Sequence, residues 1–437
     1  MILLAGAVAL GALALWWALP GLVANLPGRV RHYVPAAVIE RVITPLPSAL
    51  PAPAATPVIA LALATPAVNS PSPTPSPVKA TAPAGDPTPT TMAIIAAAPT
   101  VVATTVPATL PPPLPPYARI DGLPIIPQKF NNCGPTNLTI ILNHYGIDVD
   151  QFDVAAIARP NYEDRNVSPD ELVTYVNENT PLAAAAYAGG DIDLLRRLVA
   201  AGFPVIIEKG LEPDAATGWM GHYLTVFGYD DITGHLLTRD TFLGPWRGDG
   251  LAAYRDTERN WAQFNNTFIV VYPGERAAGL RELLGPDFAD EGTMWNAAAG
   301  KARATLALAP DDPFAWFNLG SSLTELARLD DAALFEGAAA AFDQARLLGL
   351  PPRMLWYQFG PYEAYLAGGR YDDVVELANV TLDNQGGRNV EETWFYLGRA
   401  LAGLGETADA AAAFERAARL NPDSSVGRAA RAALGEG

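Results

Sequence analysis

The chain of 437 residues contains one cysteine, Cys133, and four histidines. A single cysteine excludes an intramolecular disulfide and a four-thiolate zinc site, and so few histidines argue against a histidine-rich metal centre. Positive charge is also scarce, because 29 Lys and Arg side chains face 46 Asp and Glu, for a net charge of −17. A net-acidic chain repels nucleic acid. The sequence therefore predicts no metal, no cofactor and no nucleic-acid partner.

Charged side chains are absent from residues 2–28. Residues 2–19 are almost entirely apolar, and about 18 such residues are enough to cross a bilayer. We expect residues 1–28 to be a transmembrane anchor or signal segment rather than a buried core helix, because the run leads into a linker. An anchor is favoured, since no basic stretch precedes the run. The arginines that follow argue for a cytoplasmic C-terminal side, whereas the linker composition argues for the opposite, preferred orientation.

Residues 44–118 hold 20 of the 40 prolines and two charged side chains, Lys79 and Asp86. Proline fixes φ and removes a backbone donor, so this stretch is not expected to pack as helix or sheet. We predict a disordered, extended linker over residues 44–118, after a juxtamembrane segment at residues 29–43. Such composition is typical of stalks. We therefore expect the globular domains to be membrane-anchored or secreted and to lie outside the cytoplasm.

Residues 119–274 show helical patterns first and strand patterns later. A helix is expected after Cys133, a second from Ser168, which is followed by Pro169 and two acids, and a third over residues 194–201. Apolar runs bounded by turn residues predict four strands, at residues 204–207, 222–227, 236–238 and 267–272. This order favours an α+β domain, with helices packed on an antiparallel sheet.

Cys133 is the candidate nucleophile. Because proline belongs at a helix start, Pro135 places Cys133 at a helix N-terminus, where partial positive charge stabilises a thiolate. A cysteine nucleophile also needs an imidazole base and an oxyanion donor. His222 opens one predicted strand and Asp240 ends the next, so adjacent antiparallel strands would place the carboxylate beside the imidazole. Gln128, five residues before the cysteine, offers a side-chain amide to an oxyanion.

Each of these residues also has a structural interpretation. A lone cysteine is often a small buried hydrophobic residue, and Asp240 could cap a turn. His144 and His235 are expected to be structural. Trp219 could wall a substrate cleft or pack in the core, and the sequence leaves both interpretations open.

Together these motifs resemble the bacteriocin-processing, double-glycine-type cysteine peptidases and their solitary relatives. The similar segments are Leu123-Pro-x-x-Pro-Gln128, Asn132-Cys-Gly-Pro-Thr136, His144-Tyr-Gly146 and Gly221-His-Tyr-x-x-Val-x-Gly-Tyr-Asp-Asp231. The resemblance spans residues 120–273 and implies a papain-like fold with a Cys/His/Asp triad. It implies Cys133 as nucleophile, His222 as base, Asp240 as orienting acid and Gln128 as oxyanion donor.

We also expect Asn132, Gly221 and Trp219 to contact substrate. One departure concerns Asp240, which precedes Thr241, where the family commonly has proline. A second departure is the lack of any phosphate-binding Gly-x4-Gly-Lys loop, which the transporter-fused members carry. The double-glycine substrate therefore does not carry over to this chain.

The C-terminal part contains a repeat of about 40 residues. Trp316-x-x-Leu-Gly320-x-x-Leu323 recurs as Trp394-x-x-Leu-Gly398-x-x-Leu401, which matches the tetratricopeptide helix–turn–helix pattern. A degenerate copy at Trp356 has Pro361 inside its first helix, and residues 333–340 are interpreted as an insertion. We expect residues 290–437 to form a tetratricopeptide solenoid, in which residues 295–308 add a packing helix.

The sequence thus predicts a multidomain chain, with a papain-like α+β cysteine peptidase domain at residues 119–274 and an all-α tetratricopeptide solenoid. The predicted function is an extracytoplasmic thiol peptidase whose repeats recruit a protein substrate or partner, and whose N-terminal segment contacts a membrane. The alternatives are an inactive peptidase-like domain that serves as a tethered binding scaffold, and a purely structural component of an envelope assembly.

Overall fold

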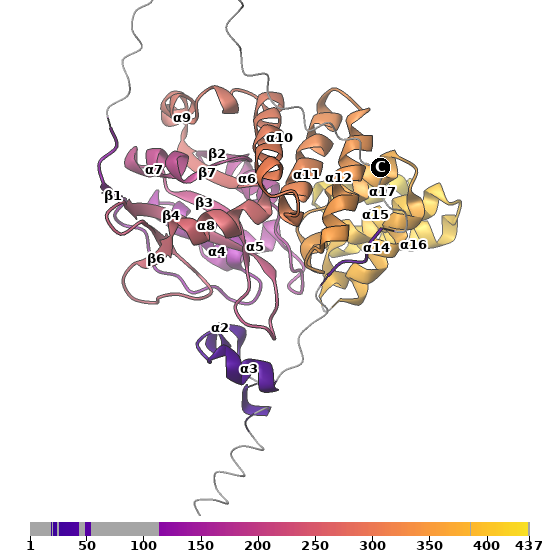
Figure 1. Ribbon diagram of the computed structural model, residues 1–437, viewed down its shortest axis with the longest axis horizontal. Coiled ribbons are helices and arrows are strands. Elements are labelled where there is room, and N and C mark those ends of the chain that lie inside the picture. The colour runs from indigo at the N-terminus through magenta and orange to yellow at the C-terminus, as the bar shows by residue number, and fades with distance from the viewer. Residues whose placement is uncertain are drawn as a thin grey trace, which may run out of the picture. The chain divides into compact units, whose positions relative to one another are not determined.

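The computed structural model of the chain describes residues 19, 21–23, 26–42, 49–53, 113–384 and 386–435 (Figure 1). Nearly all of them belong to one compact unit, made of an α+β domain and a helical region. The predicted membrane or signal segment lies mostly outside the described residues. Within the described ranges, no helix is both long and apolar enough to span a membrane.

One antiparallel sheet forms the centre of the α+β domain and has seven strands within the described residues. Their spatial order is β2-β7-β3-β4-β5-β6, and β1 pairs with β4. The strands are β1 (Tyr117–Arg119), β2 (Leu182–Tyr187), β3 (Val205–Leu211), β4 (Met220–Asp230), β5 (His235–Arg239), β6 (Gly250–Ala253) and β7 (Phe268–Pro273). The four predicted strands lie in β3, β4, β5 and β7, and the predicted α+β class is confirmed.

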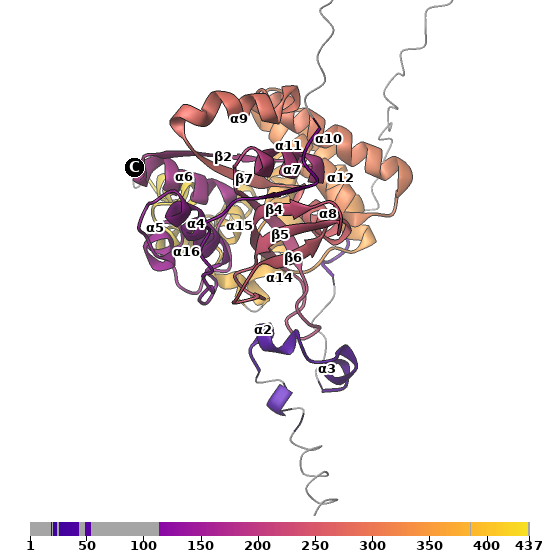
Figure 2. The ribbon, with the colours of Figure 1, turned by 90° about the vertical axis from the view of Figure 1, so that its left-hand side faces the viewer.

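Helices cover both faces of this sheet (Figure 2). They are α4 (Cys133–His144), α5 (Gln151–Ala158) and α6 (Pro169–Asn179) on one face, and α7 (Ile192–Ala200), α8 (Tyr254–Trp261) and α9 (Ala277–Leu284) on the other. Ile206 of β3 packs in the core between the sheet and helices α4, α5 and α6. Val205 and Ile207 pack in the core between the sheet and helices α7, α8 and α9. Because successive strand residues point to opposite faces, this double burial explains the continuous apolar run of β3.

The helical region is a series of packed helix pairs, α11 with α12, α13 with α14 and α15 with α16. Its helices are α10 (Glu291–Leu308), α11 (Pro313–Leu329), α12 (Leu334–Leu348), α13 (Gly360–Ala367), α14 (Tyr371–Asp383), α15 (Glu391–Gly403), α16 (Thr407–Leu420) and α17 (Ser425–Ala433). A Cβ at Gly320 would lie 2.7 Å from the Phe342 ring, and one at Gly398 would lie 2.8 Å from Phe414. The repeated glycines therefore permit close helix crossings.

One expectation about the repeats is wrong in detail. Residues 333–340 are not an insertion, because α12 begins at Leu334 and buries Ala338 in the core. Pro361 lies inside α13, the first helix of its pair, as expected, and it occupies the first turn. A missing N–H leaves no hydrogen bond unmade at that position.

Within the predicted linker, residues 44–118, the structure describes residues 49–53 and 113–118, and both stretches pack on the protein. Leu50 is 3% exposed in the core of the helical region. Tyr117 begins β1, two residues before the predicted start of the α+β domain at residue 119. In the predicted juxtamembrane segment, α2 (Gly28–Arg31) and α3 (Ala36–Val42) form, and Arg31 Nε donates to Asp214 Oδ1 at 3.2 Å.

The α+β domain and the helical region meet at a group of buried carboxyl groups. Asn166 Nδ2 donates to Glu392 Oε1 at 3.4 Å, and Asn421 Nδ2 donates to Glu171 Oε1 at 3.2 Å. Burial raises the pKa of Glu171 to about 8, with a further rise from the charge of Glu391. The pKa of Glu392 is raised well above its usual value for the same two reasons.

This interface is expected to be more stable in acid. A raised carboxyl pKa means that the folded state holds protons that the unfolded state has released, so stability is full below the unfolded pKa and is lost as pH rises through the folded pKa. We expect Glu392→Gln to stabilise the protein by about 1–3 kcal/mol at pH 8, and the gain to shrink towards pH 5. Thermal unfolding at both pH values measures this, with exposed Glu282→Gln as control. A gain independent of pH would contradict the prediction.

Candidate active site

Cys133 is the first residue of α4, as predicted. Asn132 precedes the helix without a side-chain cap, so the first backbone N–H groups remain available at the thiol end of the helix. The Cys133 side chain is half-buried. The helix behind it is buried along its length, which fixes the position of the thiol in the domain.

His222 and Asp240 are brought together by the pairing of β4 with β5. His222 Nε2 lies 3.1 Å from Asp240 Oδ1, and their side chains are 0% and 12% exposed. The same carboxylate oxygen accepts from the backbone N–H groups of Phe242 and Leu243, at 2.9 and 2.7 Å. Three donors therefore hold the Asp240 carboxylate in one orientation beside the imidazole.

The electrostatics of this pair favour its charged form. Burial lowers the pKa of His222, but the charge and hydrogen bond of Asp240, together with Cys133, outweigh burial and raise it to about 9. Burial raises the pKa of Asp240, but the His222 charge and hydrogen bond, and then Lys209, lower it to about 2. Between these values the imidazolium–carboxylate pair is the favoured state.

The Cys133 thiol is also shifted towards its ionised form. Burial raises its pKa, but a hydrogen bond to His222, the charge of that ring and the backbone at Tyr223 and Gly134 together lower it. His222 Nδ1 is buried and makes no hydrogen bond of standard geometry, and Asp240 contacts the other ring nitrogen. Nδ1 is therefore the ring nitrogen left to interact with the Cys133 thiol, and hydrogen bonds of this kind often tighten only when substrate binds.

Gln128 is fixed beside the same site through Thr241. Its backbone N–H donates to Thr241 O at 2.9 Å, and the Thr241 hydroxyl donates to Gln128 Oε1 at 2.8 Å. Because the amide oxygen is used in this way, Nε2 is left as a donor, and it makes no hydrogen bond among the described residues. The residue that replaces the family's proline after the aspartate thus orients Gln128.

The three residues expected to bind substrate are placed differently. Asn132 is 1% exposed, and its amide is used by Gln151 and Arg159, so its side chain is not open to substrate. Gly221 is buried next to His222, where a Cβ would lie 2.8 Å from Phe264. Trp219 stacks on Phe264 at 5.6 Å, which favours the packing interpretation.

Sequence reasoning missed three groups near the site. Lys209 pairs across the strands with His222 and is 9% exposed, and burial lowers its pKa while Asp240 raises it. Glu208, adjacent in β3, has a pKa raised by burial and by the charge of Cys133. The sequence feature that could have revealed Glu208 and Lys209 is a charged pair that directly follows the apolar run of a predicted strand. Tyr357 of the helical region lies 6.0 Å from Trp219, ring to ring, and no local pattern predicts that contact.

The sheet with helices on both faces, and a cysteine at a helix start near a His–Asp pair, fit the class of papain-like peptidase folds. Residues 114–269 match the Peptidase_C39 like family, and residues 391–424 match the tetratricopeptide repeat. The chain therefore carries a C39-like peptidase domain followed by a tetratricopeptide repeat, which confirms the resemblance found in the sequence.

Two solved structures are similar to part of the chain. A C39-like peptidase from Bacillus anthracis is 20% identical, over 36% of this chain and 96% of that chain, with a TM-score of 0.30. A double glycine motif protease from an AMS/PCAT transporter, in complex with the leader peptide, is 18% identical. The similarity covers 36% of this chain and 94% of that chain, with a TM-score of 0.27. A comparison with curated proteins finds no match. No group of three or more His, Cys, Asp or Glu is placed to hold a metal ion within the described part of the chain.

Proposed function

We propose that the α+β domain is a cysteine peptidase that hydrolyses amide bonds through Cys133, His222 and Asp240. The observation that carries this proposal is the 3.1 Å contact between His222 Nε2 and Asp240 Oδ1, beside a thiol whose pKa is lowered. A pair that was only structural would have no need of a thiol with a lowered pKa at a helix N-terminus.

The proposed reaction begins with attack of the Cys133 thiolate on the substrate carbonyl carbon. The oxyanion that forms accepts from Gln128 Nε2 and from the Cys133 backbone N–H, and each donor is worth about 3 kcal/mol. The His222 imidazolium then gives its proton to the departing amine as the C–N bond breaks. Water attacks the thioester, His222 takes one of its protons, and the acid leaves with the thiolate restored.

A diverse peptide library tests this function. We expect full-length protein to cleave a subset of peptides that share residues beside the cut, and Cys133→Ala to cleave none, as read by mass spectrometry. Cleavage that survives in Cys133→Ala would show a contaminating peptidase. A wild type that cleaves nothing, although its thiol is reactive, would favour the binding scaffold.

Thr241 provides a sharper test of the role of Gln128. Thr241→Val keeps the shape of the side chain and removes the hydroxyl that holds Gln128 Oε1, so we expect peptide cleavage to slow by about 10- to 100-fold. The alkylation rate of Cys133 at pH 6 should stay unchanged, because the thiolate does not depend on Gln128. Equal losses in both assays would contradict this separation of roles.

We further propose that the tetratricopeptide region recruits a protein substrate or partner, and that the globular domains are extracytoplasmic, membrane-anchored or secreted. The location rests on the uncharged residues 2–28 and on the linker composition. Protease digestion of intact cells tests the location, since a cytoplasmic domain would be protected. Co-purification with the full-length Cys133→Ala variant tests recruitment, and an empty preparation would count against it.

A further inference from the structure

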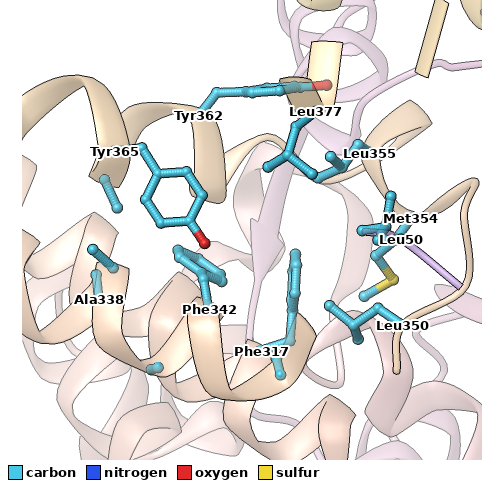
Figure 3. Packing of buried hydrophobic residues seen from close by; sticks show 14 of the residues in the cluster. Leu50, Phe317, Ala338, Phe342, Leu350, Met354, Leu355, Tyr362, Tyr365 and Leu377 are labelled. Atoms are coloured by element: carbon cyan, nitrogen blue, oxygen red, sulfur yellow. The ribbon is translucent and has the colours of Figure 1, made fainter. Parts of the chain in front are cut away.

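Residues 49–53 of the predicted linker pack on the helical region beside α12 and residues 349–355, and we call this contact surface the groove. Figure 3 shows Leu50 beside Leu350, Met354 and Leu355, which follow α12 in the chain. Leu50 is 3% exposed, and these three residues are at most 1% exposed. The Leu50 N–H donates to Leu350 O at 2.8 Å, so the segment is held by its backbone as well as by its side chain.

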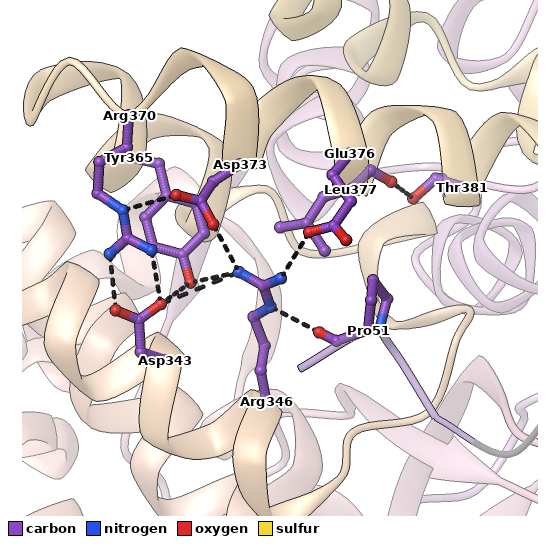
Figure 4. Close-up of polar contacts among 9 residues, drawn as sticks. All are labelled: Pro51, Asp343, Arg346, Tyr365, Arg370, Asp373, Glu376, Leu377 and Thr381. Carbon is purple, nitrogen blue, oxygen red and sulfur yellow. Dashed lines mark hydrogen bonds and ion pairs between the residues drawn. The ribbon is translucent and has the colours of Figure 1, made fainter. Parts of the chain in front are cut away.

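Arg346 of α12 provides the second backbone contact. Its Nε donates to Pro51 O at 2.9 Å, although its side chain is 1% exposed (Figure 4). Asp373 and Glu376 of α14 lie 3.5 and 3.3 Å from the other guanidinium nitrogens. These carboxylates orient the guanidinium and neutralise its charge. Nε is left to donate a hydrogen bond to an uncharged carbonyl group.

The contacts define the chemistry of the ligand. A leucine fills an apolar pocket, and its own N–H and the carbonyl of the next residue make the two hydrogen bonds. Proline suits that next position because it has no N–H that would be left without a partner in the groove. A charged residue in place of the leucine would enter a buried apolar site, which is costly. The groove thus fits an extended, uncharged Leu-Pro segment.

We propose that residues 49–53 are an intramolecular ligand of this groove, between α12, α14 and residues 349–355. Further along the chain, Tyr117 begins β1, which pairs with β4 of the sheet. A Leu-Pro segment of another protein enters the groove only when residues 49–53 leave it.

Peptide binding in trans tests the proposal on the full-length chain in a Cys133→Ala background, which makes the result independent of peptidase activity. Leu50→Asp should empty the groove, whereas Ala52→Asp adds the same charge at an exposed residue of the same segment. We expect a fluorescent peptide of residues 48–56 to bind Leu50→Asp at least tenfold more tightly than wild type or Ala52→Asp. The same peptide with aspartate in place of Leu50 should bind none of the three proteins.

Equal binding to all three proteins, or to none, would overturn the proposal. A variant with residues 49–53 replaced by Gly and Ser should behave as Leu50→Asp does, which guards against an effect of the new charge alone. Hydrogen exchange gives a second readout, since the Leu50 amide should be protected in wild type and Ala52→Asp. A wild-type dimer that Leu50→Asp converts to monomers would show that the segment binds a second copy, and would overturn the intramolecular assignment.

Discussion

Replacing His222 with alanine is expected to slow alkylation of Cys133 at pH 6 by more than about tenfold. The hydrogen bond and charge of His222 are the largest influences that lower the Cys133 pKa, and burial opposes them. Without the imidazole, burial raises the pKa of the Cys133 thiol with little to offset it, so the thiol stays protonated at pH 6. Because the chain has one cysteine, intact-mass detection of iodoacetamide addition reports on this site alone.

His144→Ala is the matched control for that experiment. His144 lies in α4 together with Cys133, but it is half-buried at the other end of the helix. Its removal should leave the alkylation rate within about twofold of wild type. An equal loss of rate in both variants would mean that damage to the fold, and not loss of the ion pair, explains the His222 result.

Asp240→Asn is expected to reduce peptide cleavage by about 100- to 10,000-fold while the protein stays folded. The Asp240 charge and hydrogen bond are the main reasons why the pKa of His222 rises to about 9. A neutral amide gives up the charge, so the pKa of His222 falls and its imidazolium form is lost at a lower pH. The pH profile of cleavage should therefore lose activity earlier on its alkaline side.

The exposed Asp256→Asn variant controls for the loss of one negative charge.

The pH dependence of the folding stability should also differ between Asp240→Asn and Asp256→Asn. Because the folded pKa of His222 is raised, its contribution is full below its unfolded pKa and disappears as pH rises through about 9. Because the pKa of Asp240 is lowered, its contribution is present above its unfolded pKa and disappears as pH falls through about 2. A variant as active as wild type across this window would show that Asp240 only caps its turn.

The parts of the site that could be predicted are those set by local structure. Pro135 after Cys133 indicated the helix start, and strand pairing indicated that Asp240 would lie beside His222. The position of Gln128 follows from Thr241, which no spacing in the sequence reveals. Asn132 was expected at the substrate site because of its place next to the cysteine, but its side chain is used by Gln151 and Arg159.

Long-range packing explains what the sequence did not reveal. The edge strand β2 is mostly alanine, which has low strand propensity, and it forms because β7 pairs with it along its length. Tyr357 reaches Trp219 only because the helical region folds back on the α+β domain. Leu50 docks although prolines lie close to it in the sequence, since its N–H and the carbonyl of Pro51 are sufficient for the two hydrogen bonds of the segment.

The most direct test of the central claim is the thiolate absorbance of the full-length protein near 240 nm, measured from pH 4 to pH 8 against Cys133→Ala. With one cysteine in the chain, the difference signal belongs to Cys133. A thiolate–imidazolium pair predicts that most of the signal is already present at pH 6 and that His222→Ala removes it. A signal that appears only with a midpoint above pH 8 would contradict the pair, and with it the peptidase mechanism.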